Sequence, residues 1–399
     1  MVPVLGGPGR GRDQADDPGC RYRGADDRLA GILVERQSRR PHHRAPHPGD
    51  RCMSTTRVTS LKGEEIVFRN EVSASGGMKD IHFHPDRKYV VGFFRDVSDQ
   101  KALRDRLSDI TTRYRENLLD QPSGPFWEKH FCWPFDVVEH NGKIGVVAPF
   151  YDKAFFFEHG SNNGDKFKIK GRDKEGKWFV GSLRDRHLDP REKGTWLTYF
   201  QICLAMARAV RRLHMAGLSH SDLSYKNVLL DPTSGRACLI DLDGLVVPDK
   251  HAPDVVGTPD FIAPEVVATQ HLDRDDPNRK LPSQATDRHA LAVLIYLYLF
   301  FRHPLRGRKI HDPDPDKDET LSMGSGALFV EHPSDASNRV RVDDLHQSAL
   351  PWGDPAQRPF TMAGSHLEKL FRRAFIAGLH HPEKRPSPSD WETALVRTL

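Results

Sequence analysis

The stretch that decides the fold reads HSDLSYKN at residues 220–227, and two short apolar runs later it is followed by DLDG at residues 241–244. Asp222 and Asn227 lie five residues apart, and Asp241 opens the second motif. This layout suits phosphoryl transfer, because one carboxylate must orient a hydroxyl while an amide and a second carboxylate hold the Mg²⁺ that bridges the ATP phosphates. We therefore expect Asp222 to be the base or hydroxyl-orienting group, and Asn227 and Asp241 to bind Mg²⁺.

The composition is that of a globular chain without a strong charge bias. Of the 399 residues, 37% are hydrophobic and 29% are charged, and this length allows two lobes with large cores. A formal net charge of +4 is too small to indicate a nucleic-acid partner. The five cysteines show no CxxC or metal spacing, which favours a reducing, cytoplasmic location. The strongest apolar run, residues 291–301, is about half the roughly 20 residues of a membrane span, so we expect a core helix and no membrane association.

The N-terminal segment differs from everything after it. The first 52 residues are rich in Arg, Gly, Pro, His and Asp, contain no Lys and show no sustained apolar period. Such a segment cannot bury enough surface to offset its ordering entropy. We expect residues 1–55 to be a disordered extension, or upstream sequence that is not translated, with Met53 as the true initiator.

Patterns of strands come first in the rest of the chain, and patterns of helices follow. Residues 56–150 contain apolar runs typical of strands, a helical spacing through Leu103, Leu107, Ile110 and Tyr114, and an Asn141-Gly142 pair that favours a hairpin. Residues 162–177 are rich in Gly and Lys, and we expect a loop or ribbon there. Beyond Trp196 the chain is mainly helical. This order predicts an α+β fold of two lobes.

The chain from residue 58 to residue 399 resembles the protein kinases. GTPDFIAPE at residues 257–265 looks like the end of a kinase activation segment, and Asp287 matches the Asp that begins the central helix of the large lobe. PEKRP at residues 382–386 looks like the closing Arg motif, which implies that Glu265 pairs with Arg385. The resemblance implies a protein-kinase-like fold with a small antiparallel-sheet N-lobe plus one helix over residues 56–150, and a larger, mainly helical C-lobe over residues 151–399. It also implies ATP and Mg²⁺ as cofactors and a protein substrate.

Three residues around the two motifs depart from the kinase pattern. Ser221 replaces an Arg that commonly needs a phosphorylated loop, and residues 245–257 contain no Ser, Thr or Tyr, so the enzyme should not depend on that switch. Lys226 stands where tyrosine kinases often place an Arg, and we interpret it either as a cation near the transferred phosphate or as an exposed lysine. Asp243 replaces a Gly, and the resulting Asp-x-Asp, similar to that of aminoglycoside and choline kinases, could supply a further Mg²⁺ contact.

The phosphate-binding region is the least ordinary part. ASGGMK at residues 74–79 fills the six slots of the usual Gly-x-Gly-x-x-Gly, and Gly76 and Gly77 still allow the backbone to approach the phosphates. Lys79 occupies the third Gly slot, as in the with-no-lysine kinases. The resemblance therefore implies that Lys79 reaches the α and β phosphates.

The strand that usually carries the ATP lysine does not offer one. Its lysine slot falls on Phe94 or Arg95, so Arg95 is a second candidate for cofactor binding, and Lys88 is a third. The acidic helix partner of the lysine is left open among Asp105, Asp109 and Glu116.

At the level of the whole sequence, SGGMK, HSDLSYKN and DLDGLVVP together resemble a bacterial kinase family associated with tellurite-resistance and stress-response clusters. The resemblance implies von Willebrand A-domain proteins and PP2C-type phosphatases as partners. Our interpretation is a protein kinase specific for Ser or Thr. A pseudokinase scaffold is one alternative, opposed by the intact Asp222, Asn227 and Asp241. A small-molecule kinase of the aminoglycoside-phosphotransferase type is the other, opposed by the activation-segment motif at residues 257–265.

Overall fold

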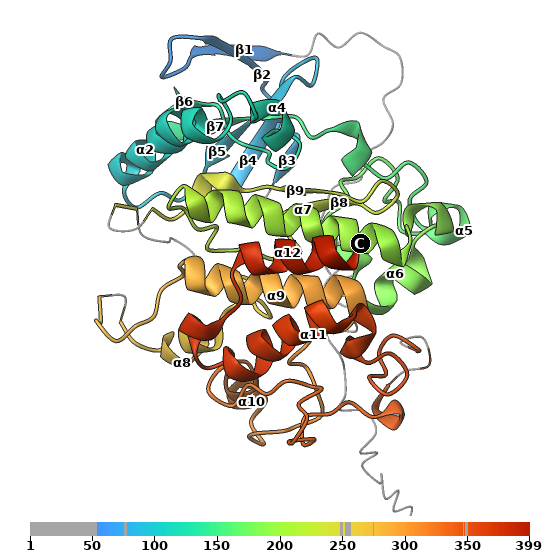
Figure 1. Ribbon diagram of the computed structural model, residues 1–399. Coiled ribbons are helices and arrows are strands. Elements are labelled where there is room, and N and C mark those ends of the chain that lie inside the picture. Colours follow the sequence, from blue (N-terminus) through green and yellow to red (C-terminus); the bar gives the residue numbers. More distant parts are fainter. Residues whose placement is uncertain are drawn as a thin grey trace, which may run out of the picture.

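The computed structural model describes residues 54–75, 78–247, 250–251, 257–273, 275–345, 347 and 350–399. The expected N-terminal extension, apart from its last two residues, lies outside this range, as do Gly76 and Gly77. The described chain forms a smaller, strand-rich lobe stacked on a larger, mainly helical lobe (Figure 1). The expected two-lobed α+β arrangement is confirmed.

A five-stranded antiparallel sheet forms the small lobe, in the order β3-β4-β5-β7-β6. Asn141 and Gly142 both have positive φ, 49° and 73°, which matches the twist that a two-residue hairpin needs, and this predicted turn joins β6 to β7. A separate hairpin of β1 and β2 precedes the sheet. The bounds of the strands are β1 Thr55–Thr59, β2 Glu65–Arg69, β3 Ala74–Ser75, β4 Lys79–Phe83, β5 Tyr89–Phe94, β6 Asp136–His140 and β7 Lys143–Pro149.

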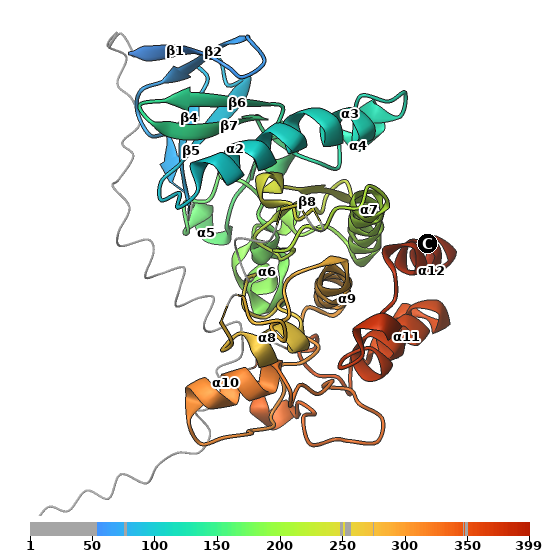
Figure 2. The same cartoon turned by 90° about the vertical axis from the view of Figure 1, so that its left-hand side faces the viewer.

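The predicted helix of the small lobe runs alongside the sheet (Figure 2). It begins as α2 (Gln100–Asp109), where the Asp99 side chain accepts a hydrogen bond from the backbone N–H of Ala102. A π-helical turn at Ile110–Tyr114 and then α3 (Arg115–Leu118) continue it. Leu103 and Leu107 pack against the sheet. The helical spacing read from the sequence therefore marks the buried face.

Two long helices form the centre of the large lobe. α7 (Trp196–Met215) and α9 (Gln284–Phe300) each begin with a capping box, at Thr195 and Ser283. Every residue of α9 from His289 to Phe300 is buried, which confirms the predicted core helix. No helix in the described ranges is both long and apolar enough to cross a membrane. A short helix, α4 (Gly124–Trp127), precedes β6, and β8 (Val228–Asp231) and β9 (Arg236–Leu239) form a hairpin. The remaining helices are α8 (Pro264–Thr269), α10 (Pro315–Met323), α11 (Ser365–Arg372) and α12 (Pro388–Thr398).

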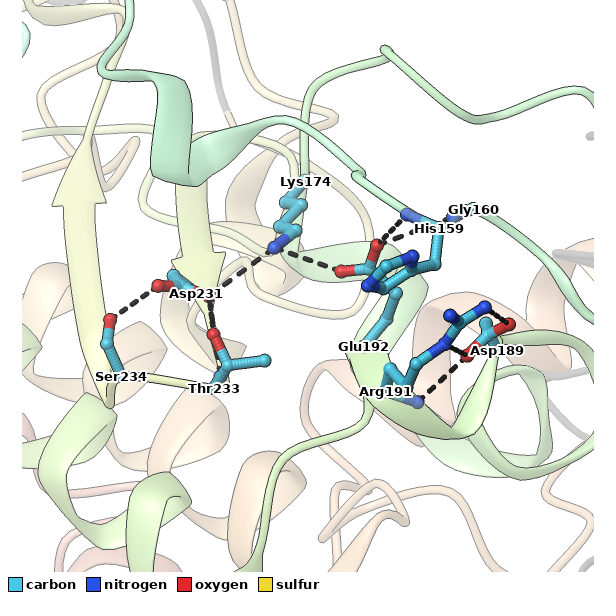
Figure 3. A network of polar contacts seen from close by, with 9 residues as sticks. All are labelled: His159, Gly160, Lys174, Asp189, Arg191, Glu192, Asp231, Thr233 and Ser234. Carbon is cyan, nitrogen blue, oxygen red and sulfur yellow. Dashed lines mark hydrogen bonds and ion pairs between the residues drawn. The ribbon is translucent and has the colours of Figure 1, made fainter.

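The predicted loop or ribbon at residues 162–177 is a loop of the large lobe over most of its length, because Asn163 and Gly164 within the short element α5 (Asn162–Asp165) have positive φ, 51° and 70°. The segment leads into a 3₁₀ turn at Gly176–Phe179 and α6 (Gly181–His187). Its anchor is a buried charge network, in which the Lys174 Nζ lies 3.0 Å from Glu192 Oε2 and 3.4 Å from Asp231 Oδ1 (Figure 3).

This network is well satisfied despite its burial. The other oxygen of Glu192 accepts the backbone N–H of His159 at 2.6 Å, and Asp231 accepts the hydroxyl of Thr233 at 2.6 Å (Figure 3). Buried charges are tolerable only when they are paired in this way. The network fixes the end of β8, and thus the strand that leaves the HSDLSYKN loop.

Candidate active site

The loop of residues 220–227 is held from below by the start of α9. Asp287, which is 1% exposed, accepts the backbone N–H of His220 at 2.7 Å and that of Ser221 at 3.2 Å. Ser221 has a φ of 68°, a conformation that costs a non-glycine residue energy and persists where the surroundings enforce it. His220 is buried, and its Nε2 lies 3.0 Å from the carbonyl oxygen of Ile240. As predicted, His220 braces the loop, and Asp287 fixes its entrance.

Asp222 and Asn227 come together at the far end of this loop. Asn227 is buried, and its Nδ2 donates to the Asp222 carbonyl at 2.8 Å and to Asp222 Oδ2 at 3.0 Å. The other carboxylate oxygen of Asp222 accepts the hydroxyl of Thr258 at 2.8 Å. Two donors from different segments thus fix the orientation of the half-buried carboxylate.

Thr258 is the residue that the sequence reasoning missed. Thr258 belongs to the motif at residues 257–265, but the sequence did not indicate that it contacts Asp222. Its position directly after Gly257, in the segment that follows DLDG, was the available signal. A small hollow lies beside this pair, lined by Asp222, Thr258 and mostly apolar side chains, among them Phe261 and Ile262.

Asp241 and Asp243 meet Lys79 across the boundary between the lobes. Asp241 follows β9 with a φ of 61°, and its Oδ1 lies 2.7 Å from the ammonium of Lys79. Asp243 lies deeper, and its two oxygens are 2.8 and 2.7 Å from the same ammonium. The Asp241 side chain is 49% exposed, whereas the Asp243 side chain is 11% exposed. The structure therefore brings three of the predicted site residues into one cluster.

The Lys79 ammonium stabilises both carboxylates of this cluster, whereas the two carboxylates repel each other. Burial disfavours the Lys79 ammonium, but the carboxylates of Asp243 and Asp241 outweigh that effect and raise its pKa above the ordinary value. Lys79 in turn lowers the pKa of Asp241. Burial raises the pKa of Asp243, and the ammonium beside it offsets much of that cost.

The register of β4 and β5 explains how Lys79 arrives there. Lys79 is the first residue of β4 and is paired with Phe94, the last residue of β5, whose ring centroid lies 5.2 Å from the ammonium. A Cβ atom added at Gly92 would lie 3.4 Å from Lys79 Cδ, so the lysine stem crosses β5 over a position without a side chain. Phe94 at the end of β5 therefore lies beside an ammonium that comes from the neighbouring strand β4.

Arg95 and Lys88, the alternative candidates for the phosphate-binding cation, lie in surroundings different from those of Lys79. The Nε of Arg95 lies 2.9 Å from Asp80 Oδ1, and its Nη2 donates to the Lys79 carbonyl at 3.1 Å. The Lys88 side chain is exposed. Neither is among the partners of Asp241 or Asp243 within the described chain.

Among the described residues, four further candidates, Asp105, Asp109, Glu116 and Lys226, form no hydrogen bond or ion pair with the Lys79 cluster. Asp109, at the end of α2, bonds to Lys250 and to His251 Nε2, the latter at 2.7 Å. Asp105 and Glu116 are exposed. Lys226 is exposed on the loop, and no side-chain hydrogen bond or ion pair of Lys226 is found within the described ranges. The helix partner of Lys79 that the sequence left open is therefore not supplied by these three carboxylates.

Comparison with known proteins agrees with this geometry. Residues 186–359 match the protein kinase domain family. A dual serine/threonine and tyrosine protein kinase of Apis mellifera is 38% identical over 85 residues, or 21% of this chain and 9% of that protein. The serine/threonine-protein kinase PknD of Chlamydia felis is 30% identical over 267 residues, or 56% of this chain and 26% of that protein. The chain thus matches between about a tenth and a quarter of the length of these relatives.

Among solved structures, the rhoptry antigen kinase domain of Toxoplasma gondii aligns with 93% of this chain and 91% of its own, at 14% identity and a TM-score of 0.47. The family match and the two-lobed architecture together identify the fold as protein-kinase-like, with an antiparallel-sheet N-lobe and a helical C-lobe.

Proposed function

We propose that this chain is an ATP- and Mg²⁺-dependent protein kinase that transfers the γ-phosphate of ATP to a Ser or Thr hydroxyl. The observation that carries the proposal is that two pairs, Asp222 with Asn227 and Asp241 with Lys79, lie side by side on a protein-kinase-like fold. The backbone N–H of the residue before Asp241 donates to the Asn227 carbonyl at 3.0 Å and joins the two pairs. Similarity to serine/threonine-protein kinases supports a hydroxyl of a protein as acceptor.

Asn227 and Asp241 are the proposed Mg²⁺ ligands, and their chemistry fits that ion. Mg²⁺ binds oxygen, and at such sites one or two protein side chains hold it together with the phosphates of the substrate. The Nδ2 of Asn227 is turned toward Asp222, which leaves its Oδ1 as a donor for a cation. Asp241 is half exposed, so one of its oxygens can face a nucleotide. When bound, the ion would neutralise charge on the phosphates.

Asp222 is the proposed acceptor of the proton from the substrate hydroxyl. Thr258 and Asn227 fix its carboxylate, so the oxygens keep one orientation while the acceptor approaches. A group positioned in this way contributes through geometry as much as through basicity.

Cations and backbone donors complete the phosphate site in this proposal. Lys79 contacts the α and β phosphates, as in the with-no-lysine kinases, and Gly76 and Gly77 allow the backbone to lie over them. Lys226 extends from the loop toward the transferred phosphate. Arg95 supports β4 through Asp80 and is the alternative to Lys79 for the phosphates.

A bacterial stress-signalling role in the cytoplasm is also proposed, with a von Willebrand A-domain protein and a PP2C-type phosphatase as partners. This part rests on the resemblance of the three sequence motifs to the stress-associated kinases. The phosphatase would reverse the modification that the kinase makes.

The test is a transfer assay with the purified chain, γ-labelled ATP, Mg²⁺ and the proteins that neighbouring genes encode. We expect label on a Ser or Thr of one such protein, and no label with the Asp222→Asn chain. A wild-type chain that binds Mg²⁺-ATP without any transfer would indicate a scaffold. Label on an aminoglycoside or choline in place of protein would indicate a small-molecule kinase.

A further inference from the structure

Lys79 contacts Asp243 through both carboxylate oxygens and Asp241 through one. Both oxygens of Asp243 lie within 2.8 Å of the Lys79 ammonium, and the two side chains are 11% and 16% exposed. Charge-assisted hydrogen bonds of this length in a partly dry setting are among the strong ones. The pair also joins β4 of the small lobe to the turn after β9 of the large lobe.

The path of the Lys79 side chain restricts where its ammonium can lie. It crosses β5 over Gly92 and ends beside the ring of Phe94, 5.2 Å from the ring centroid. Since β4 and β5 are paired at Lys79 and Phe94, the sheet register fixes where the stem begins. An unanchored lysine would still lose much rotamer entropy when it binds a phosphate, and a bonded carboxylate removes that cost in advance.

Helix α2 offers no buried carboxylate that could anchor Lys79. Its buried side chains are Leu103, Arg106 and Leu107. The acidic residue at its end, Asp109, is bonded to Lys250 and His251. An anchor for Lys79 must therefore come from elsewhere among the described residues, and Asp241 and Asp243 are the two carboxylates within reach.

Asp241 and Asp243 differ in exposure, and this difference suits them to different roles. Asp241 gives Lys79 one oxygen and is half exposed, which suits a group that also binds a metal. Asp243 is buried and has both oxygens on the ammonium. A metal at Asp243 would have to displace the lysine and would meet a carboxylate with little room for further ligands.

We propose that Asp243 is the positioning residue of Lys79: a carboxylate on the metal-binding turn that anchors the phosphate-binding lysine, in place of a carboxylate on α2. This inference rests on the proposed function, because it assigns a partner to the lysine of that site. It replaces the sequence-based expectation of Asp243 as a further Mg²⁺ contact. It also makes the lysine position independent of small movements of α2.

The experiment uses the full chain with Asp243→Asn, Lys79→Met and the double variant, each compared with the matched helix variant Glu116→Gln. Urea unfolding without nucleotide tests the pair by itself. We expect each single variant to unfold at lower urea than wild type, and the double variant to unfold at higher urea than the sum of the two losses predicts. Glu116→Gln should match wild type. Additive losses would overturn the anchor.

Kinetics at varied Mg²⁺ separate an anchor from a metal ligand. We expect Asp243→Asn to lower kcat at least about tenfold, with no further loss in the double variant beyond Lys79→Met, since residues that act as a unit are not additive. The Mg²⁺ concentration for half-maximal rate should stay within about twofold of wild type. Asp243→Glu, which keeps the charge, should recover part of the rate. A large rise in the Mg²⁺ requirement together with additive losses would make Asp243 a metal ligand.

The two measurements also separate this inference from the proposed function. If the wild-type chain transfers no phosphate, the proposed function fails, and the urea cycle still decides whether Asp243 anchors Lys79. If wild type is active and the urea cycle is additive, the function stands and the anchor is wrong.

Discussion

Arg385 and Glu265 lie 120 residues apart in the sequence and face each other through two parallel hydrogen bonds, Nη1 to Oε1 at 2.8 Å and Nη2 to Oε2 at 2.6 Å. Arg385 is 1% exposed, and its other donors bond to the carbonyl oxygens of Gly378, Ala285 and Leu379. The pair predicted from the sequence is confirmed. It ties the segment that begins α8 to the last turn before α12.

Removal of the acid from this pair should therefore destabilise the large lobe strongly. Glu265→Ala strands the buried guanidinium of Arg385, which costs roughly 3–5 kcal/mol of unfolding free energy. The matched control is Glu65→Ala, because its partner Arg57 and Glu65 itself are both more than 60% exposed, and such surface pairs contribute about 1 kcal/mol or less. Urea unfolding of both variants measures the two losses of stability. Equal losses would mean that the buried pair has no special role.

Substitution of the two carboxylates proposed for catalysis, Asp222 and Asp241, should have different effects. Asp222→Ala removes the hydroxyl-orienting group, so we expect transfer to fall by a factor of about 10² to 10⁴ while Mg²⁺-ATP still binds. Asp241→Ala should also abolish transfer and should weaken Mg²⁺-ATP binding, because it removes a proposed ligand. Calorimetric titration of each variant, with circular dichroism as a check of folding, measures the difference. Near-normal transfer by Asp222→Ala would refute the assignment of the loop.

Substitutions of the three candidate cations should differ in their effect on activity. Lys79→Ala should cost activity by orders of magnitude, because the ammonium bonded to Asp241 and Asp243 is lost. Lys88→Ala, at an exposed position, should be nearly neutral. Arg95→Ala should have an intermediate effect through its contact with Asp80. Parallel kinetics on the three variants provide the comparison, and a nearly normal Lys79→Ala chain would return the phosphate role to Arg95.

The site could be located from the sequence where chemistry restricts both residue type and order. Asp222, Asn227 and Asp241 fall within two short motifs, and the structure brings the first two into direct contact. The Asn141-Gly142 hairpin and the spacing of Leu103 and Leu107 were readable because they follow from local backbone and periodicity.

The remaining contacts depend on geometry that no local pattern encodes. Asp243 lies 164 residues from Lys79, and the contact requires the register of β4 on β5 and the closure of the two lobes. The first segment of the large lobe depends on the buried Lys174 network, whose members are also far apart in the sequence. The sequence could therefore name Lys79 but not its partner.

The activation segment should be competent without phosphorylation. Ser221 replaces the usual Arg, and the stretch of residues 245–257 contains no hydroxyl residue. Asp109 of α2 instead bonds to His251 at 2.7 Å and to Lys250, which ties this segment to the small lobe. Phosphatase treatment should leave the rate within about twofold, while Asp109→Asn should lower it, because charge-assisted bonds are about twice as strong as neutral ones. A large loss after phosphatase treatment would require a phosphosite elsewhere.

Acid should weaken the large lobe through His303. This side chain is buried, its Nδ1 accepts the backbone N–H of Leu305 at 3.1 Å, and its Nε2 lies 2.9 Å from the carbonyl oxygen of Asp260, a pattern that fits the neutral ring. Burial lowers the pKa of His303 to about 4, against the opposing carboxylate of Asp260. The unfolded chain takes up the proton near pH 6.5, whereas the folded chain does so only near pH 4.

The sign of the effect follows from this difference in proton uptake. The unfolded state binds more protons between these two pH values. The contribution of the neutral His303 to the free energy of unfolding is therefore complete above about pH 6.5 and is lost as the pH falls toward about 4. At about pH 5 the loss amounts to about 2 kcal/mol of unfolding free energy. We expect His303→Gln to be less stable than wild type at neutral pH, and the gap to narrow by that amount at about pH 5. Urea unfolding of both proteins at the two pH values measures the gap, and a constant gap would show that His303 does not titrate between them.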